Sequence, residues 1–170
     1  TTHSELPGIQ ELFAFRPETA APLQALAQQL LRGPSSLTPV ERETIAAVVS
    51  FDNDCVFCSR SHEGAAVALA GGDEQIVQRA RTEPATLTPK MRALVAIARK
   101  VAKGGKQVDG SDVEAARAAG ADDVAIHDTV LVAAAFCMFN RYVDGLASTT
   151  PPPGPAYAMM GKMLAERGYG

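Results

Sequence analysis

Helix start and stop signals divide this sequence into a series of helical segments. No segment shows the alternation of apolar and polar residues that is typical of a half-buried strand. The clearest start is Thr38, which can cap a helix with Pro39 in its first position and Glu41 completing a capping box. The clearest stop is the pair Gly71-Gly72. These signals and the apolar periodicity predict helices over residues 17–31, 38–51, 55–70, 73–82, 88–103, 111–119, 122–146 and 155–167. The sequence therefore predicts an all-α fold.

The alanine content agrees with a helical fold. Alanine occupies 30 of the 170 positions, while aromatic residues make up 5% of the chain and tryptophan is absent. Alanine has the highest helix propensity, and its small side chain lets helices approach closely. Such a chain buries little apolar area per residue, so we expect contacts between subunits to add to it and the protein to be a homo-oligomer. The length is that of one domain, which we expect to span residues 1–170.

Charge, hydropathy and cysteine content indicate which binding partners and which cellular compartment to expect. A net charge of −3 gives no reason to expect nucleic acid or an anionic membrane as a partner. No run of 18 apolar residues is present, and residues 1–8 lack the basic and apolar regions of a secretory signal. Three cysteines, two of them three positions apart, do not resemble a secreted disulfide framework. We therefore expect a cytoplasmic protein without a membrane span.

A short echo in the sequence indicates an internal repeat. Leu87-Thr88-Pro89 repeats Leu37-Thr38-Pro39 fifty residues later, and Arg92 falls in the same register as Arg42. This pattern predicts a degenerate repeat of helical hairpins, although only a few positions carry it. The most apolar helix, over residues 122–146, should be central to the core or to a subunit interface.

The residues most suggestive of chemistry are Cys55, Cys58 and His62. They stand at positions i, i+3 and i+7, which share one face of a helix. The break at Asn53-Asp54 puts both cysteines in the first turn, where unpaired N–H groups and the helix macrodipole favour an anion. This location predicts a lowered thiol pKa, and the imidazole can accept the thiol proton. The pattern supplies a nucleophile, a resolving thiol and a proton acceptor, and therefore favours thiol redox chemistry.

Zinc binding and simple packing are the alternatives for this cluster. Buried cysteines are common packing residues, and two thiolates with one imidazole are good zinc ligands. A fourth zinc ligand is not evident, because His3, His127 and Cys137 are scattered along the chain. We favour the redox interpretation and expect neither a metal nor a cofactor.

Glu43 joins the candidate site if two predicted helices fold back on each other. It lies one to two turns into the helix that precedes Cys55. In an antiparallel pair its carboxylate can relay a proton to His62 or to a thiol. By itself, a glutamate in a first turn more often interacts with the helix dipole.

Several other polar residues have simpler interpretations. Asn140, Arg141 and Asp144 interrupt an otherwise apolar helix, and Arg141 and Asp144 are spaced as a structural ion pair. We expect Cys137 to be a packing cysteine and His127 to be a structural histidine.

The arrangement of Glu43, then twelve residues later Cys55-x-x-Cys58-x-x-x-His62, resembles the core motif of the alkylhydroperoxidase D-like (AhpD-like) proteins. These proteins belong to the carboxymuconolactone decarboxylase superfamily, and the chain is most similar to its uncharacterised peroxidase-related branch. The resemblance covers about residues 37 to 169. It extends to residues 87–94, 112–120, 140–141 and 164–169.

The resemblance implies an all-α fold of helical hairpins that assembles as a trimer or hexamer. It also implies reduction of a small-molecule hydroperoxide, with electrons from an external dithiol or a lipoyl-type reductant. Cys58 would then be oxidised to the sulfenic acid, and Cys55 would donate a proton and close the disulfide. Glu43 and His62 would form the proton relay.

This sequence departs from the family pattern at two points. Phe57 stands where the best-described alkylhydroperoxidases have a second histidine, and the dithiol lies in the first half of the chain instead of late in it. The first departure removes one member of the relay. A dithiol electron-relay or disulfide reductase module, and an oligomeric scaffold with a relic motif, therefore remain open. Lactone decarboxylation is a weaker interpretation, because the decarboxylases do not depend on this cysteine pair.

Overall fold

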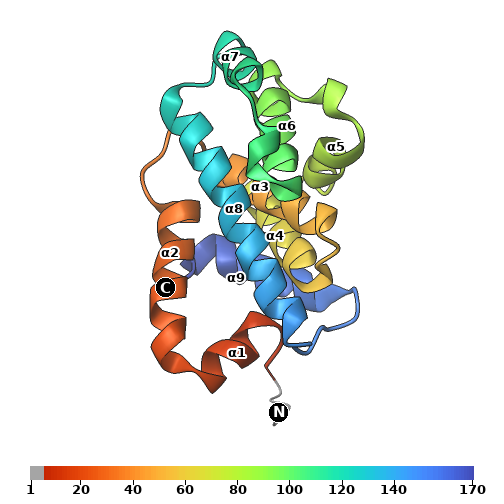
Figure 1. Ribbon diagram of the computed structural model, residues 1–170. Helices are drawn as coiled ribbons and strands as arrows, with labels where there is room; N and C mark the ends of the chain where they lie inside the picture. The colour runs from red at the N-terminus through yellow and green to blue at the C-terminus, as the bar shows by residue number, and fades with distance from the viewer. Residues whose placement is uncertain (1–5) are drawn as a thin grey trace.

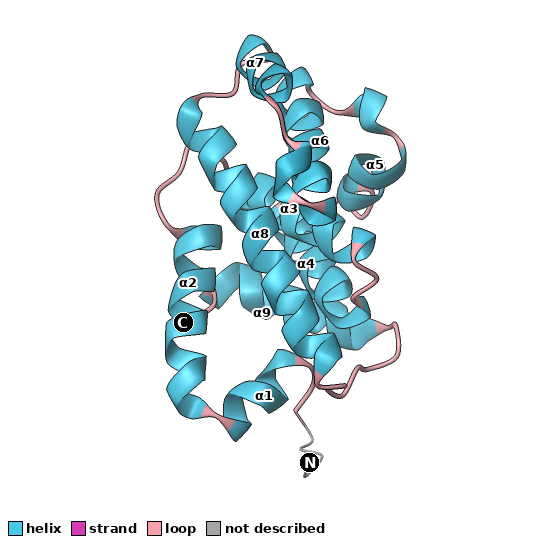
Figure 2. Cartoon of the chain, in the orientation of Figure 1, coloured by secondary structure: helices cyan, strands magenta, loops and turns pink. Residues whose placement is uncertain are grey.

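The computed structural model describes residues 6–170, and the regular structure in this range is entirely helical (Figures 1 and 2). The α-helices are α1 (Ile9–Phe15), α2 (Pro17–Arg32), α3 (Pro39–Asp52), α4 (Val56–Leu69), α5 (Ile76–Thr82), α6 (Pro89–Lys103), α7 (Gly110–Ala118), α8 (Asp123–Gly145) and α9 (Pro155–Arg167). Two short 3-10 helices lie at Pro84–Thr86 and Gly105–Gln107. The prediction of an all-α fold is confirmed.

Most helix boundaries follow the predicted capping signals. Thr38 caps α3 through a capping box with Glu41, and Thr88 caps α6 by accepting a hydrogen bond from the Met91 amide. The short helix α1 was not predicted, because its N-cap, Gly8, offers no capping side chain.

Ser111 and Glu114 have the spacing of a capping box in the sequence, which predicts Ser111 as the N-cap of α7, and this prediction is wrong. Asp109 caps α7, since its side chain accepts from the amides of Ser111 and Asp112, and the Asp112 carboxylate accepts from the Asp109 amide. The same reciprocal pattern is therefore formed two residues earlier in the chain, by two aspartates.

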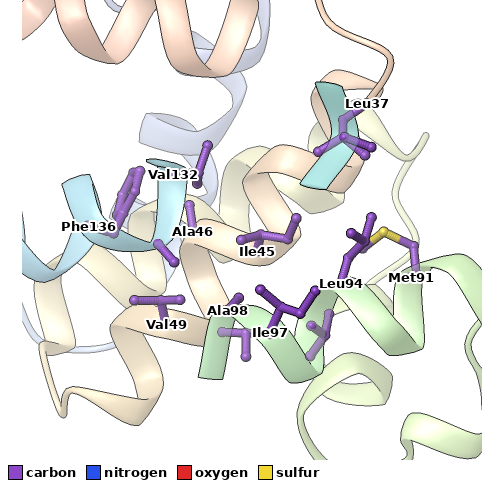
Figure 3. Close-up of a cluster of buried hydrophobic side chains, with 14 of the residues drawn as sticks. Leu37, Ile45, Ala46, Val49, Met91, Leu94, Ile97, Ala98, Val132 and Phe136 are labelled. Atoms are coloured by element: carbon purple, nitrogen blue, oxygen red, sulfur yellow. The ribbon is translucent and has the colours of Figure 1, made fainter. Parts of the chain in front are cut away.

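Helix α3 is the centre of the structure. Residues 42–50 are all buried, and α4, α6 and α8 pack around them. Ile45, Ala46 and Val49 of α3 contact a layer of side chains from α6 and α8, which Figure 3 shows as one continuous cluster. The cluster includes Leu94, Ile97, Ala98, Val132 and Phe136. A helix buried on all sides must be apolar almost throughout, so the charged residues within it require partners.

The α3–α4 hairpin is closed by a three-residue turn. Asp54 adopts a left-handed conformation with φ 58°, which a short polar residue tolerates. The Cys55 amide donates to the Ser50 carbonyl at 3.0 Å, and the Asn53 amide donates to the Val49 carbonyl at 3.0 Å. This turn makes α3 and α4 antiparallel neighbours, so Glu43 lies opposite His62.

Helix α9 covers α4 at a crossing of two glycines. A Cβ atom added at Gly161 would lie 2.2 Å from the carbonyl carbon of Gly64. A Cβ at Gly64 would lie 2.6 Å from the carbonyl oxygen of Tyr157. The two backbones therefore meet directly, and this contact brings the end of α9 to the first turns of α4.

Helix α8 runs the length of the molecule, with α7 near its start and α1 near its end (Figure 1). This 23-residue helix contains an 18-residue stretch that is long and apolar enough to cross a membrane, with a mean hydropathy of 1.3. Half of this stretch is buried inside the protein, and the core helix of a soluble protein can have the same length and composition. The packing of α8 on α3 and α6 accounts for its composition.

The two copies of the predicted repeat differ in their surroundings. Both begin with a capping threonine and a proline at the first helical position. Arg42 is buried and donates to the carbonyls of Leu30 and Gly33, whereas Arg92 is exposed. The two copies of the repeat are therefore alike at their helix starts but differ in the role of the arginine.

We predict that Gly161→Ala destabilises the protein, because the added methyl group meets backbone atoms that cannot rotate away. Overpacking of this kind costs about 1–3 kcal/mol of unfolding free energy. Gly145→Ala is the matched control, since nothing lies within 4 Å of its added Cβ. The control should be neutral or stabilising by up to about 1 kcal/mol. Urea unfolding of both variants tests this, and equal unfolding free energies would contradict the close approach of α4 and α9.

Candidate active site

A pocket of about 470 Å3 opens beside the first half of α4. Its polar groups include Cys58, Ser61 and His62 of α4 and Tyr169, which follows α9. The rest of the wall is largely apolar and comes from α1, α8 and α9, with Ile9, Phe13, Phe136, Phe139, Met160 and Met163 among its residues. The pocket therefore joins a reactive thiol and an imidazole to an apolar chamber.

The two cysteines differ in their access to this pocket. Cys55 is the N-cap of α4 and Cys58 its third residue, so both lie in the first turn as predicted. Both are reduced and buried, and their thiols are hydrogen-bonded to each other. Cys58 lines the pocket, whereas Cys55 lies behind it with an exposed fraction of 0%. A molecule in the pocket therefore meets Cys58 first.

The pKa of the Cys58 thiol is raised, whereas a position at a helix N-terminus predicts a lowered pKa. The hydrogen bond with Cys55 raises the pKa of the Cys58 thiol, and burial and the nearby Cys55 charge raise it further. Negative charge on one sulfur opposes ionisation of the other, and burial removes solvation from a thiolate. The prediction of a lowered pKa is therefore wrong for Cys58, although it lies in the first turn of α4.

Asn140 of α8 is the polar side chain that opposes this effect. Its side chain hydrogen-bonds Cys58 and thereby lowers the pKa of the thiol, although by less than the other effects raise it. The Asn140 amide group is itself fixed, because Nδ2 donates to Ser50 Oγ at 3.0 Å and Oδ1 accepts from Asn53 Nδ2 at 2.9 Å. The sequence identifies Asn140 as a polar residue in an apolar helix but predicts no role for it.

Glu43 and His62 are joined by a buried hydrogen bond. Glu43 Oε2 lies 2.7 Å from His62 Nδ1, and Glu43 Oε1 lies 2.7 Å from Arg32 Nη2. Burial raises the pKa of Glu43, but the charges and hydrogen bonds of His62, Arg32 and Tyr169 outweigh it and lower the pKa overall. The carboxylate is therefore ionised and accepts from Nδ1–H, which leaves Nε2 of the neutral ring as the proton acceptor.

Tyr169 completes this group from the far end of the chain. Its hydroxyl donates to Glu43 Oε1 at 2.7 Å and lies 3.1 Å from His62 Nδ1. Its ring stacks on the imidazole, with centroids 5.8 Å apart and an interplanar angle of 12°. Burial and the charge of Glu43 raise the pKa of the hydroxyl well above its ordinary value, so it remains a donor. Neither Tyr169 nor Arg32 was among the predicted site residues.

The structure brings the four predicted site residues into two adjoining groups. Glu43 and His62 form one, Cys55 and Cys58 the other, and His62 and Cys58 share the pocket wall. Within residues 6–170 no direct hydrogen bond joins His62 to either cysteine. A small molecule bound in the pocket can therefore lie between the imidazole and the Cys58 sulfur.

Phe57 takes part in packing. It is buried, and its ring lies 6.3 Å from the Tyr157 ring between centroids. A Cβ atom at Gly8 would lie 2.3 Å from its ring, so Phe57 holds the segment before α1 against α4. This position contributes an apolar surface where a second relay histidine would stand.

The remaining predicted residues lie outside the pocket wall. The predicted ion pair of Arg141 with Asp144 is wrong, because Arg141 Nη1 donates to the Cys137 carbonyl at 2.8 Å. His127 is exposed and its Nδ1 lies 2.9 Å from Asp128 Oδ1. Cys137 is half-buried and accepts from Asn53 Nδ2 at 3.5 Å. Their interactions are local to α8 and to the α3–α4 turn.

No grouping of three His, Cys, Asp or Glu side chains suited to a metal ion occurs in residues 6–170. His62 is directed at Glu43, and His127 is paired with Asp128. His3, considered above as a ligand, lies outside the described residues.

Comparison with known proteins relates this fold and motif to one family. The sequence pattern of the carboxymuconolactone decarboxylase family matches residues 17–82, which include Glu43, Cys55, Cys58 and His62. No curated protein sequence matches the chain significantly.

Solved structures extend the similarity over nearly the whole chain. An uncharacterised peroxidase-related protein from a Silicibacter species is 30% identical with a TM-score of 0.78, over 89% of this chain and 78% of that one. An uncharacterised peroxidase-related protein from Ralstonia eutropha with an alkylhydroperoxidase D core is 26% identical, also with a TM-score of 0.78, over 92% and 82%. A protein of unknown function from Agrobacterium tumefaciens shares the fold at 24% identity and a TM-score of 0.69, over 84% and 97%.

The identity and coverage of the Silicibacter match, together with the family pattern over residues 17–82, show the family of this protein. The chain belongs to the alkylhydroperoxidase D-like proteins of the carboxymuconolactone decarboxylase superfamily.

Proposed function

We propose that this protein is a thiol-dependent peroxidase that reduces hydroperoxides through a Cys55–Cys58 dithiol and disulfide cycle. The observation that carries the proposal is the shared pocket. It presents Cys58 and His62 to the same space, with Cys55 hydrogen-bonded behind Cys58 and Glu43 hydrogen-bonded behind His62. A peroxidase of this type needs a nucleophilic sulfur, a resolving sulfur and a proton shuttle.

The first chemical step is attack of the Cys58 sulfur on the terminal oxygen of the hydroperoxide. An S–O bond forms and the O–O bond breaks, which gives the Cys58 sulfenic acid and an alkoxide. The thiol proton passes to Nε2 of His62, which returns it to the alkoxide to release an alcohol. Glu43 stabilises the imidazolium that forms between these two transfers, because its carboxylate is bound to Nδ1.

The second step closes the disulfide. The Cys55 sulfur attacks the Cys58 sulfur, and the hydroxyl group leaves as water after protonation. An external dithiol then reduces the disulfide by two electrons and restores both thiols. The sum is hydroperoxide plus dithiol giving alcohol, water and oxidised dithiol.

The division of roles between the cysteines is supported by their exposure and contacts. Cys58 faces the pocket and receives the hydrogen bond of Asn140, which favours its thiolate. Cys55 is fully buried at the N-cap of α4, three positions before Cys58, and interacts with the Cys58 thiol strongly enough to raise its pKa. Cys58 is therefore the proposed peroxide-reactive residue and Cys55 the resolving one.

The remaining features of the proposal concern partners and assembly. We propose an external dithiol or lipoyl-type reductant, because a slender dithiol can enter an apolar pocket and reach the Cys58 sulfur that lines it. A reducing, cytoplasmic location suits an active dithiol. A homo-oligomer, trimer or hexamer, follows from the family resemblance.

A dithiol electron-relay or disulfide reductase is the second candidate. It is favoured by Phe57, which puts an apolar ring where a second relay histidine would stand. That histidine would carry a proton toward the alkoxide that leaves a peroxide, whereas thiol–disulfide exchange releases no alkoxide. Second-order rate constants with hydroperoxides and with dithiol carriers separate the two functions, since the relay predicts faster reaction with the carrier.

We predict that Cys58→Ser abolishes hydroperoxide consumption and that Cys55→Ser halts the cycle at the sulfenic acid. Consumption of an alkyl hydroperoxide with dihydrolipoamide as reductant measures the first effect. Trapping with a sulfenic-acid reagent, followed by mass spectrometry, measures the second at Cys58. Cys137→Ser is the control and should retain activity, because this cysteine lies outside the pocket wall. Wild-type rates in both Cys55→Ser and Cys58→Ser would disprove the mechanism.

We also predict that His62→Gln lowers kcat/KM by about a hundredfold, the size of a lost general acid–base contribution. Glu43→Gln should act in the same direction with a smaller loss, because the imidazole remains but its counter-charge is removed. Steady-state rates with an alkyl hydroperoxide measure both effects. His127→Gln is the matched control, since that histidine is exposed and lies away from the pocket. If His62→Gln and His127→Gln behave alike, the relay takes no part in turnover.

A further inference from the structure

The segment that follows α9 is held against α2 by specific contacts. Gly168 has φ 73°, and a Cβ atom there would lie 2.4 Å from Gln28 Oε1, so the chain turns closely past this side chain. The Tyr169 amide donates to Gln28 Oε1 at 2.8 Å. Arg32 donates to the Leu164 carbonyl at 3.0 Å, and its guanidinium lies 5.1 Å from the centre of the Tyr169 ring. The position of Tyr169 is therefore determined by α2 as well as by α9.

The donors and acceptors around His62 Nδ1 show that the Tyr169 hydroxyl acts as an acceptor toward this nitrogen. A phenol has one hydrogen, and here it is donated to Glu43 Oε1. Toward Nδ1, which is 3.1 Å away, the oxygen can only accept. Glu43 Oε2 is also an acceptor at 2.7 Å, so Nδ1 faces two acceptors and no donor. This environment strongly favours the tautomer that carries its proton on Nδ1.

The same hydroxyl fixes the orientation of the carboxylate. Glu43 Oε1 receives hydrogen bonds from both Arg32 and Tyr169, which leaves Oε2 directed at the imidazole. Arg32 alone would not determine this, because a guanidinium can bind both carboxylate oxygens.

From these contacts we infer that Tyr169 is a positioning residue for the proton relay, which holds His62 in the Nδ1–H tautomer and leaves Nε2 as its single exchanging site toward the pocket. Its effect on turnover rests on the proposed function, whereas its effect on the tautomer does not. The segment from Gly168 to Tyr169 is in this sense part of the site, held in place by Gln28 and Arg32.

Tyr169→Phe tests the inference, because it removes the hydroxyl and keeps the ring that stacks on His62. Tyr157→Phe is the matched control: it is also a tyrosine of the C-terminal region, but its hydroxyl donates to the Pro151 carbonyl at 2.9 Å. Nitrogen-15 NMR of the His62 imidazole, measured on the reduced protein without peroxide, reports the tautomer directly. Rates of hydroperoxide reduction across pH report the effect on turnover.

We expect Tyr169→Phe to move His62 toward a mixture of tautomers. The variant should also lower kcat about tenfold with little change in KM, because one hydrogen bond to a charged group is lost. Its pH–rate profile should also change shape. Tyr157→Phe should keep the wild-type imidazole signals and profile. Gln28→Ala, which removes the anchor of the Tyr169 amide, should act in the same direction as Tyr169→Phe and serves as the test if that variant does not fold.

The outcomes separate the inference from the proposed function. Identical imidazole signals in Tyr169→Phe and Tyr157→Phe would overturn the positioning role, whatever the activity. If wild-type protein shows no cysteine-dependent reduction of hydroperoxides, the peroxidase proposal fails, and an altered tautomer in Tyr169→Phe still supports the positioning role. An altered tautomer together with a reshaped pH–rate profile supports both.

Discussion

The buried carboxylate of Glu43 is the constraint on which the site depends. It lies at the centre of α3 with an exposed fraction of 0%, where an unpaired charge would cost several kcal/mol. Its three partners come from separate segments: Arg32 at the end of α2, His62 in α4, and Tyr169 after α9. The charge can be buried only when these segments have assembled, so the stability of this group and the geometry of the relay are set by the same contacts.

Local signals were sufficient to predict the α-helices other than α1 and part of the site. Thr38 and Thr88 mark helix starts through their own side-chain hydrogen bonds, and the turn at Asn53 and Asp54 is encoded by polar residues that tolerate its conformation. A tight turn between two helices fixes which residues face each other. For this reason the pairing of Glu43 with His62 could be anticipated from their positions on either side of the turn.

Contacts between distant segments could not be predicted in this way. Tyr169 reaches Glu43 only because α9 crosses α4 at Gly64 and Gly161, and neither glycine is distinguishable in the sequence from one that ends a helix. Asn140 was visible only as a polar residue in an apolar helix, since its contacts with Ser50 and Asn53 depend on how α8 packs on α3. The sign of the Cys58 pKa shift was missed for the same reason, because it follows from burial and from the Cys55 thiol more than from the helix end.

That shift has a consequence for how the proposed reaction is controlled. A Cys58 thiol with a raised pKa is protonated in the resting protein, so it does not present a standing thiolate to every electrophile. Attack then requires a base that takes the proton as the S–O bond forms, and His62 is the base that shares the pocket wall with Cys58. Only a molecule that enters the pocket and accepts that proton on its leaving oxygen completes the step. Burial of the dithiol and fixation of the imidazole by Glu43 therefore act together: the first suppresses unselective thiol chemistry, and the second makes reaction possible for a bound hydroperoxide.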